Sequence, residues 1–123
     1  MIVAPSILSM DFTKMRQEMT DVNKSEAKWL HFDVMDGHFV PNLTFGPDIL
    51  KAVKSLTNKV LDVHIMVKDP LRVANYFVDL GIDYLTFHLE ACENEKEVLE
   101  VIDFIKRKGV KVGISIKPGT DVR

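Results

Sequence analysis

The chain has 123 residues, 46% of them hydrophobic and 28% charged, which suits one globular domain or part of one. Its net charge of -2 and pI of 6.1 imply no strongly basic face and argue against nucleic acid as a partner. The sequence has neither an apolar run of membrane-spanning length nor a signal peptide, and its one cysteine, Cys92, excludes an internal disulfide, so we expect a cytoplasmic protein without a membrane partner.

Short apolar stretches rich in β-branched or aromatic residues alternate with stretches of helical spacing along the whole chain. The predicted strands are 2–8, 29–34, 60–66, 83–88 and 110–116, and the predicted helices are 11–24, 47–57, 70–80 and 94–108. A unit of about 25–30 residues is the βα repeat that builds parallel sheets. The pattern predicts one α/β domain over residues 1–123, with about five parallel strands and four helices.

The ends of the predicted helices carry the expected residues. Asp69 is a capping carboxylate placed before Pro70, which fits the first helical position because its missing N–H costs nothing there. Gly81 and Gly109 stand where a helix should end in a left-handed conformation before the next strand begins. These signals support the alternation of helices and strands.

Two parallel-sheet architectures compete, the closed barrel and the open doubly wound sheet. The first turn, at residues 9–11, lacks the Gly-x-Gly-x-x-Gly of the dinucleotide-binding open sheet. Barrel enzymes assemble their sites from the C-terminal ends of several strands, and the polar residues of this chain fall at such ends. These residues are Ser6, His31, Asp33, His64 and His88. The pattern favours a barrel.

A closed barrel has eight strands and typically more than about 200 residues. We therefore expect this chain to be the N-terminal part of a (β/α)₈ TIM barrel. Unpaired strand edges invite pairing with another chain, so we also expect a homo-oligomer.

The stretch from Trp29 to Gly37 carries the clearest chemical signal. Side chains alternate along a strand, so His31, Asp33 and Met35 are predicted to share one face. A histidine and a carboxylate two residues apart can bind one metal ion, and His64 holds the corresponding place on the next strand. A lone histidine in an apolar strand is more often a hydrogen-bonded core residue than a ligand, so spacing alone leaves both interpretations open. An imidazole–carboxylate set suits zinc, iron, manganese or cobalt.

Five stretches of the chain resemble the ribulose-phosphate 3-epimerase family, in the family's order and spacing. They are APSILSMDF (4–12), HFDVMDGHFVPN (31–42), DVHIMV (62–67), TFHLEA (86–91) and KVGISIKPGT (111–120). The block 31–42 is highly specific, whereas residues 4–6 alone would be a weak signal. Met10 stands where the family more usually has a small residue.

The resemblance implies that His31, Asp33 and His64 are three of four ligands to one divalent metal, Zn²⁺ or Fe²⁺ first and Mn²⁺ or Co²⁺ as alternatives. It also implies that Asp33 is one of two acid/base carboxylates. The family reaction is epimerisation at C3, which interconverts D-ribulose 5-phosphate and D-xylulose 5-phosphate in the pentose phosphate pathway. The implied partner is therefore a small-molecule sugar phosphate.

The same resemblance implies roles for residues around the metal. Ser6 and His64 match positions that contact substrate, and Met35 and Met66 match methionines that crowd the reacting carbons. His88 matches a histidine that lies near the active site without a ligand role. The family's second catalytic aspartate and its phosphate-binding loops correspond to positions beyond residue 123, so we expect the chain alone to be inactive.

Three other interpretations were weighed. A hexulose-6-phosphate epimerase, acting for example on allulose 6-phosphate, would use the same metal and carboxylates. A decarboxylase with an Asp-x-Lys-x-x-Asp array is excluded because Met35 stands where the lysine is required. A non-enzymatic half barrel that associates through open strand edges is the third.

Overall fold

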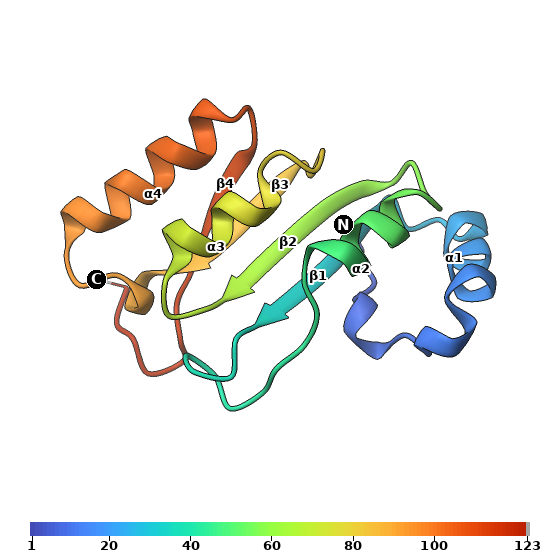
Figure 1. Cartoon of the computed structure of the whole chain (residues 1–123), viewed down its shortest axis with the longest axis horizontal. Coiled ribbons are helices and arrows are strands. Elements are labelled where there is room, and N and C mark those ends of the chain that lie inside the picture. The colour runs from blue at the N-terminus through green and yellow to red at the C-terminus, as the bar shows by residue number, and fades with distance from the viewer. Residues whose placement is uncertain (123) are drawn as a thin grey trace.

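The computed structural model describes residues 1–122, which form a four-stranded parallel sheet with α-helices packed against it (Figure 1). The strands are β1 (Trp29–Met35), β2 (Val60–Met66), β3 (Tyr84–His88) and β4 (Lys111–Ser115), and the helices are α1 (Met15–Lys24), α2 (Pro47–Lys54), α3 (Pro70–Phe77) and α4 (Glu95–Arg107). Short 3₁₀ turns cover Ile7–Ser9, Phe12–Lys14 and Leu89–Ala91. The predicted fold class is confirmed: the architecture is α/β and is consistent with part of a TIM barrel.

The strands lie in the order β1-β2-β3-β4, so each strand pairs with the next one in the sequence. Right-handed crossovers between consecutive parallel neighbours place the connecting helices on one face of the sheet. The register of β1 on β2 runs without a break from Trp29 opposite Val60 to Met35 opposite Met66. This ladder puts residues two positions apart on each strand at matching heights across the pair.

The two faces of the sheet differ in chemistry. Leu30 and Phe32 of β1 are fully buried toward the helices, while the alternate residues of the strand are half-buried on the other face. The alternation predicted for β1 is therefore confirmed. The core between sheet and helices contains Met19, Leu50, Val53, Val63, Ile65, Phe77, Phe87 and Ile105, all 1% exposed or less. The apolar core thus occupies one face and leaves the other free for polar side chains.

The predicted start of α3 and the left-handed glycines are confirmed, but α3 ends at Phe77 rather than directly before Gly81. The Asp69 carboxylate accepts a hydrogen bond from the Arg72 backbone N–H, and Pro70 is the first residue of α3. Gly81 and Gly109 have φ angles of 77° and 75°, in the left-handed region that favours glycine. Each glycine lets the chain turn from a helix toward the following strand.

The first predicted strand, residues 2–8, is wrong. Only Ser6 forms an isolated bridge with His31, whose backbone N–H donates to the Pro5 carbonyl at 2.9 Å. Pro5 has no N–H to contribute to a ladder, and the Ser6 hydroxyl accepts the Leu8 N–H, which starts the turn Ile7–Ser9. The described structure therefore has four strands, and this segment meets β1 only at Ser6.

Within residues 1–122, none of the helices combines the length and the apolar character needed to cross a lipid bilayer.

Candidate metal centre and active site

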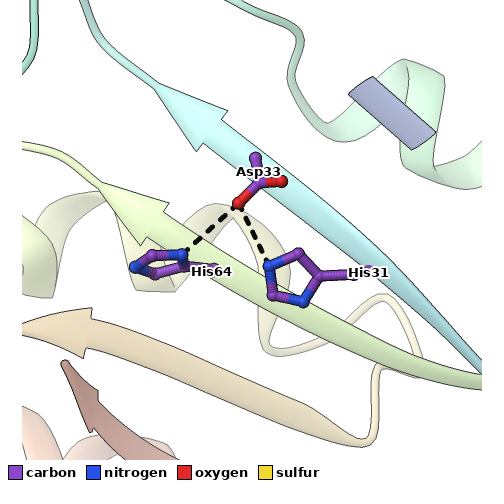
Figure 2. A group of neighbouring side chains, drawn as sticks. All are labelled: His31, Asp33 and His64. Atoms are coloured by element: carbon purple, nitrogen blue, oxygen red, sulfur yellow. Dashed lines mark hydrogen bonds and ion pairs between the residues drawn. The ribbon is translucent and has the colours of Figure 1, made fainter. Parts of the chain in front are cut away.

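Two adjacent strands bring His31, Asp33 and His64 together on the face of the sheet that points away from the core (Figure 2). Asp33 and His64 are register partners on β1 and β2, and His31 lies two residues before Asp33 on the same face. Asp33 Oδ1 lies 3.1 Å from His31 Nε2 and 3.4 Å from His64 Nδ1. One ligand atom from each residue lies within 4.8 Å of the others. Two imidazole nitrogens and one carboxylate oxygen at this spacing are consistent with a divalent metal.

The Asp33 carboxylate and the His31 imidazole shift each other's pKa. Hydrogen bonding to His31, the largest cause, holds the pKa of Asp33 well below its usual range, despite the opposing effect of burial. Hydrogen bonds to Asp33 and Asp62 raise the pKa of His31 to about 9. Without a metal, His31 is therefore protonated at neutral pH while Asp33 is ionised.

Asp62 on β2 holds the second nitrogen of His31. Its Oδ2 lies 2.9 Å from His31 Nδ1, and the two residues are partners in the strand register. This contact leaves His31 Nε2 to face Asp33. Sequence reasoning missed Asp62, although its position two residues before His64 puts it on the same face of β2.

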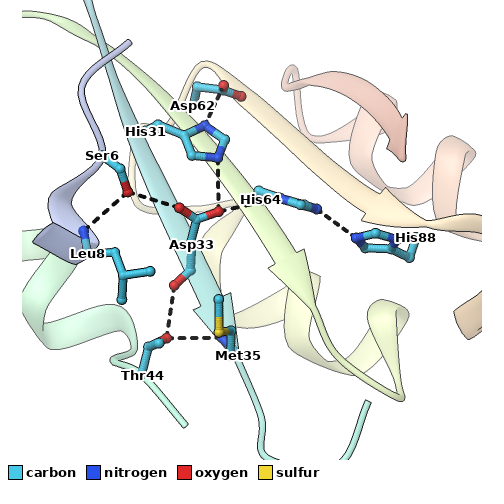
Figure 3. A network of polar contacts seen from close by, with 9 residues as sticks. All are labelled: Ser6, Leu8, His31, Asp33, Met35, Thr44, Asp62, His64 and His88. Atoms are coloured by element: carbon cyan, nitrogen blue, oxygen red, sulfur yellow. Dashed lines mark hydrogen bonds and ion pairs between the residues drawn. The ribbon is translucent and has the colours of Figure 1, made fainter. Parts of the chain in front are cut away.

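Ser6 and Thr44 fix Asp33 from two other directions (Figure 3). The Ser6 hydroxyl donates to Asp33 Oδ2 at 2.9 Å, so the two carboxylate oxygens have separate neighbours. The Thr44 hydroxyl donates to the Asp33 carbonyl at 2.9 Å and accepts the Met35 N–H at 3.0 Å. Thr44 was not predicted, because its contact depends on how the loop after β1 folds back.

His88, at the end of β3, contacts His64 directly. Their Nε2 atoms are 2.9 Å apart, and the rings stack with centroids separated by 4.9 Å. Burial and the neighbouring His64 lower the pKa of His88. On its other side, His88 Nδ1 lies 3.4 Å from Glu90 Oε2. Glu90 was not predicted, because no local pattern links a residue of a 3₁₀ turn to a metal site.

Met35 and Met66 are register partners at the C-terminal ends of β1 and β2, and both are half-buried. Each methionine lies two residues after Asp33 or His64 and so shares the same face of its strand. Their expected contact with the reacting carbons of a substrate stays a prediction, as do the substrate contacts of Ser6 and His64.

A parallel α/β sheet with two imidazoles and a carboxylate on the face away from the core is consistent with one class of protein, the enzymes built on α/β barrels. Comparison with known proteins narrows this class. The model of the ribulose-phosphate 3-epimerase family matches residues 2–123, and the chain belongs to this family.

Curated relatives agree with this assignment. The chain is 47% identical over 121 residues to the ribulose-phosphate 3-epimerase of Bacillus subtilis, a match that covers 98% of the chain and 54% of that protein. It is 47% identical over 120 residues to the enzyme of that name from Treponema pallidum, with 98% and 54% covered. For the Mycobacterium tuberculosis protein of the same name, the identity is 44% over 119 residues, with 97% and 50% covered. The chain thus spans about half the length of the curated relatives it matches.

Proposed function

We propose that this chain carries one half of the active site of a metal-dependent epimerase that interconverts D-ribulose 5-phosphate and D-xylulose 5-phosphate at C3. The observation that carries the proposal is the environment of Asp33. One of its oxygens faces two imidazole nitrogens, and the other is held by the Ser6 hydroxyl. The relatives are named ribulose-phosphate 3-epimerases, which supports a ribulose phosphate as the substrate.

The reaction requires the removal and return of one proton. The two sugars differ only in configuration at C3, next to the C2 carbonyl, so loss of the C3 proton leaves an enediolate. Return of a proton to the opposite face inverts the centre. His31, Asp33 and His64 would hold a divalent cation, which when bound would supply positive charge to stabilise the developing enediolate.

Asp33 is the group that we assign to proton transfer. Its lowered pKa keeps the carboxylate ionised and therefore in the proton-accepting form. Oδ1 faces the two histidines, so we assign acceptance of the C3 proton to Oδ2, which the Ser6 hydroxyl orients. Ser6 and His64 would also contact the sugar. Met35 and Met66 would cover the reacting carbons and exclude water that could protonate the enediolate.

Inversion needs a second acid/base group on the opposite face of the sugar. Asp62, another carboxylate on this face of the sheet, is engaged by His31 Nδ1. We assign the second carboxylate and the phosphate-binding loops to the half of the relatives that this chain does not match. The chain alone should therefore have negligible turnover.

A chimera tests this function. The chain is joined to the C-terminal part of the Bacillus subtilis relative that it does not match, loaded with Zn²⁺ or Fe²⁺, and incubated with D-ribulose 5-phosphate in D₂O. NMR should show deuterium at C3 together with D-xylulose 5-phosphate. Asp33→Asn in the same chimera should slow C3 exchange by about 10²- to 10⁴-fold, because it removes the proton acceptor.

The unfused chain, run in parallel, should show neither deuterium at C3 nor the epimer. A folded, metal-loaded chimera without C3 exchange would contradict the proposed function. Faster exchange with D-allulose 6-phosphate would reassign the substrate to the hexulose and keep the chemistry.

We also propose that the 123-residue chain, without the half of its relatives that it does not match, associates with copies of itself through the edge of β4. This strand pairs with β3 on one side and with no other strand among residues 1–122. Ile114 of β4 and Ile116 just beyond it are 47% and 36% exposed. An exposed edge with apolar side chains is a template for pairing with another chain.

A further inference from the structure

His64 has a second nitrogen that the metal site does not use. Nδ1 faces Asp33, whereas Nε2 points the other way and lies 2.9 Å from His88 Nε2 (Figure 3). At that distance one nitrogen must carry a hydrogen and the other a lone pair. The position of the ring proton on His88 therefore decides which nitrogen of His64 holds its own proton.

Glu90 in turn determines which ring nitrogen of His88 carries the proton. His88 is 8% exposed, and His88 Nδ1 and Glu90 Oε2 are both buried, without another hydrogen-bond partner among the described residues. The two atoms lie 3.4 Å apart, so each is the group best placed to satisfy the other. A carboxylate only accepts hydrogen bonds, so the proton must be on His88 Nδ1. His88 Nε2 is then an acceptor and receives the N–H of His64 Nε2.

We propose that Glu90 and His88 are positioning residues that keep a proton on Nε2 of His64 and thereby present the lone pair of Nδ1 as the metal-binding nitrogen. The inference rests on the metal site of the proposed function. The two candidate histidine ligands would then bind the metal through different ring nitrogens. Asp62 engages Nδ1 of His31 and leaves Nε2 for the metal, while His88 engages Nε2 of His64 and leaves Nδ1. Groups that hold the outer nitrogen of a ligating histidine fix both its tautomer and its ring orientation.

The other oxygen of Glu90 binds the loop after β4. Oε1 accepts the backbone N–H of Lys117 and, at 2.5 Å, the hydroxyl of Thr120. The Lys117 ammonium lies 4.0 Å from the centre of the Phe39 ring, and that ring lies 5.2 Å from His88. One carboxylate thus joins a loop from the far end of the sheet to a candidate ligand on β2.

This arrangement makes Glu90→Gln a sharp test. The Lys117 N–H and the Thr120 hydroxyl keep the carbonyl oxygen of the new side chain on the loop, so its NH₂ group turns toward His88 Nδ1. His88 must then move its proton to Nε2, where it opposes the N–H of His64. Zn²⁺ affinity should fall by about 10- to 100-fold.

The readouts are isothermal titration of Zn²⁺ into this chain and ¹⁵N NMR of its histidine ring nitrogens, with circular dichroism to verify folding. In the unsubstituted Zn²⁺-bound chain, His88 should be protonated at Nδ1 and His64 should bind zinc through Nδ1. In Glu90→Gln, the His88 proton should be found at Nε2. Thr120→Val is the matched control, because it removes one contact of Oε1 and leaves Oε2 facing His88; it should preserve both the tautomer and the affinity.

Three results would overturn the proposal. The first is a proton on His88 Nε2 in the unsubstituted chain, which needs no variant to detect. The second is unchanged Zn²⁺ affinity in a folded Glu90→Gln variant, and the third is an equal loss of Zn²⁺ affinity in Thr120→Val while its His88 proton stays on Nδ1. None of these measurements uses a sugar phosphate, so a failure of the epimerase proposal would be seen separately.

Discussion

His31 links proton binding to metal binding through a single side chain. The carboxylates of Asp33 and Asp62 face its two ring nitrogens and raise its pKa to about 9, against an ordinary value of 6.5. A metal at Nε2 must displace the proton held there. The site therefore exchanges one proton for one cation.

This exchange predicts a pH dependence of metal affinity. Below a pKa of about 9, His31 is protonated in the metal-free chain, so Zn²⁺ affinity should rise about tenfold per pH unit as pH increases toward that value. Titration calorimetry in buffers of different ionisation enthalpy should count one proton released per Zn²⁺. Affinity independent of pH over this range would contradict the coupling.

Asp33→Asn provides the control in the metal-free chain, where the histidine pKa can be followed by NMR. Loss of the hydrogen bond to Asp33, the largest contribution, should bring the pKa of His31 back toward 6.5. The stabilisation that the charged ring gives the folded state is fully present below 6.5 and is lost as pH rises through about 9. The variant should therefore flatten this loss of stability with pH.

The connections between elements depend on backbone conformations that few residues adopt. Gly81, between α3 and β3, and Gly109, between α4 and β4, have nearly the same positive φ. Their surroundings differ: a Cβ at Gly81 would lie 1.9 Å from the Lys54 ammonium, whereas a Cβ at Gly109 would meet no atom within 4 Å. Alanine substitutions at these two glycines therefore distinguish the cost of backbone strain from the cost of crowding.

Both Gly81→Ala and Gly109→Ala should lower the free energy of unfolding by about 1–2 kcal/mol, the cost of a left-handed conformation with a Cβ. Gly81→Ala should cost more, because it also displaces the Lys54 ammonium from its 2.8 Å hydrogen bond to the Gly81 carbonyl. Urea unfolding measures both values. An equal loss in the two variants would mean that the Lys54 contact adds nothing to stability.

At the scale of the whole molecule, the exposed edge of β4 should control association of the 123-residue chain when it lacks the half that its relatives add. Ile114→Lys places a charge on the edge strand and should shift the chain toward the monomer in sedimentation velocity. Leu99→Lys is the matched control, because Leu99 is 55% exposed on α4, away from any strand edge. Equal effects of the two substitutions would contradict association through β4.

Local sequence patterns were sufficient for the parts of the molecule that depend on neighbours in the chain. The alternation in 29–34 predicted which side chains of β1 share a face, and Asp69 and Gly109 marked helix ends correctly. Residues 2–8 were misread because their apolar run resembles a strand, while Pro5 and the hydroxyl of Ser6 turn the chain out of the sheet.

The surroundings of the candidate ligands could not be read in the same way. Asp62 reaches His31 through the register of two strands, and Glu90 reaches His88 and the loop 117–120 through contacts between separate segments. Such contacts depend on how distant parts of the chain meet, and no periodicity in the sequence encodes that. The groups that bind metal are thus easier to predict than the groups that orient them.

The unbroken register of β1 on β2 has a consequence for how such a site can diverge. His31 with Asp62, Asp33 with His64, and Met35 with Met66 form three successive rungs across the two strands. The first two pairs contain the imidazole and carboxylate groups, and the third is a pair of thioethers at the C-terminal ends of the strands. Under the proposed function, exchange of the Met35–Met66 pair would change the room and polarity around the sugar while the other two pairs stay in place. Substrate preference could then change through this one cross-strand pair, without any change to the candidate ligands.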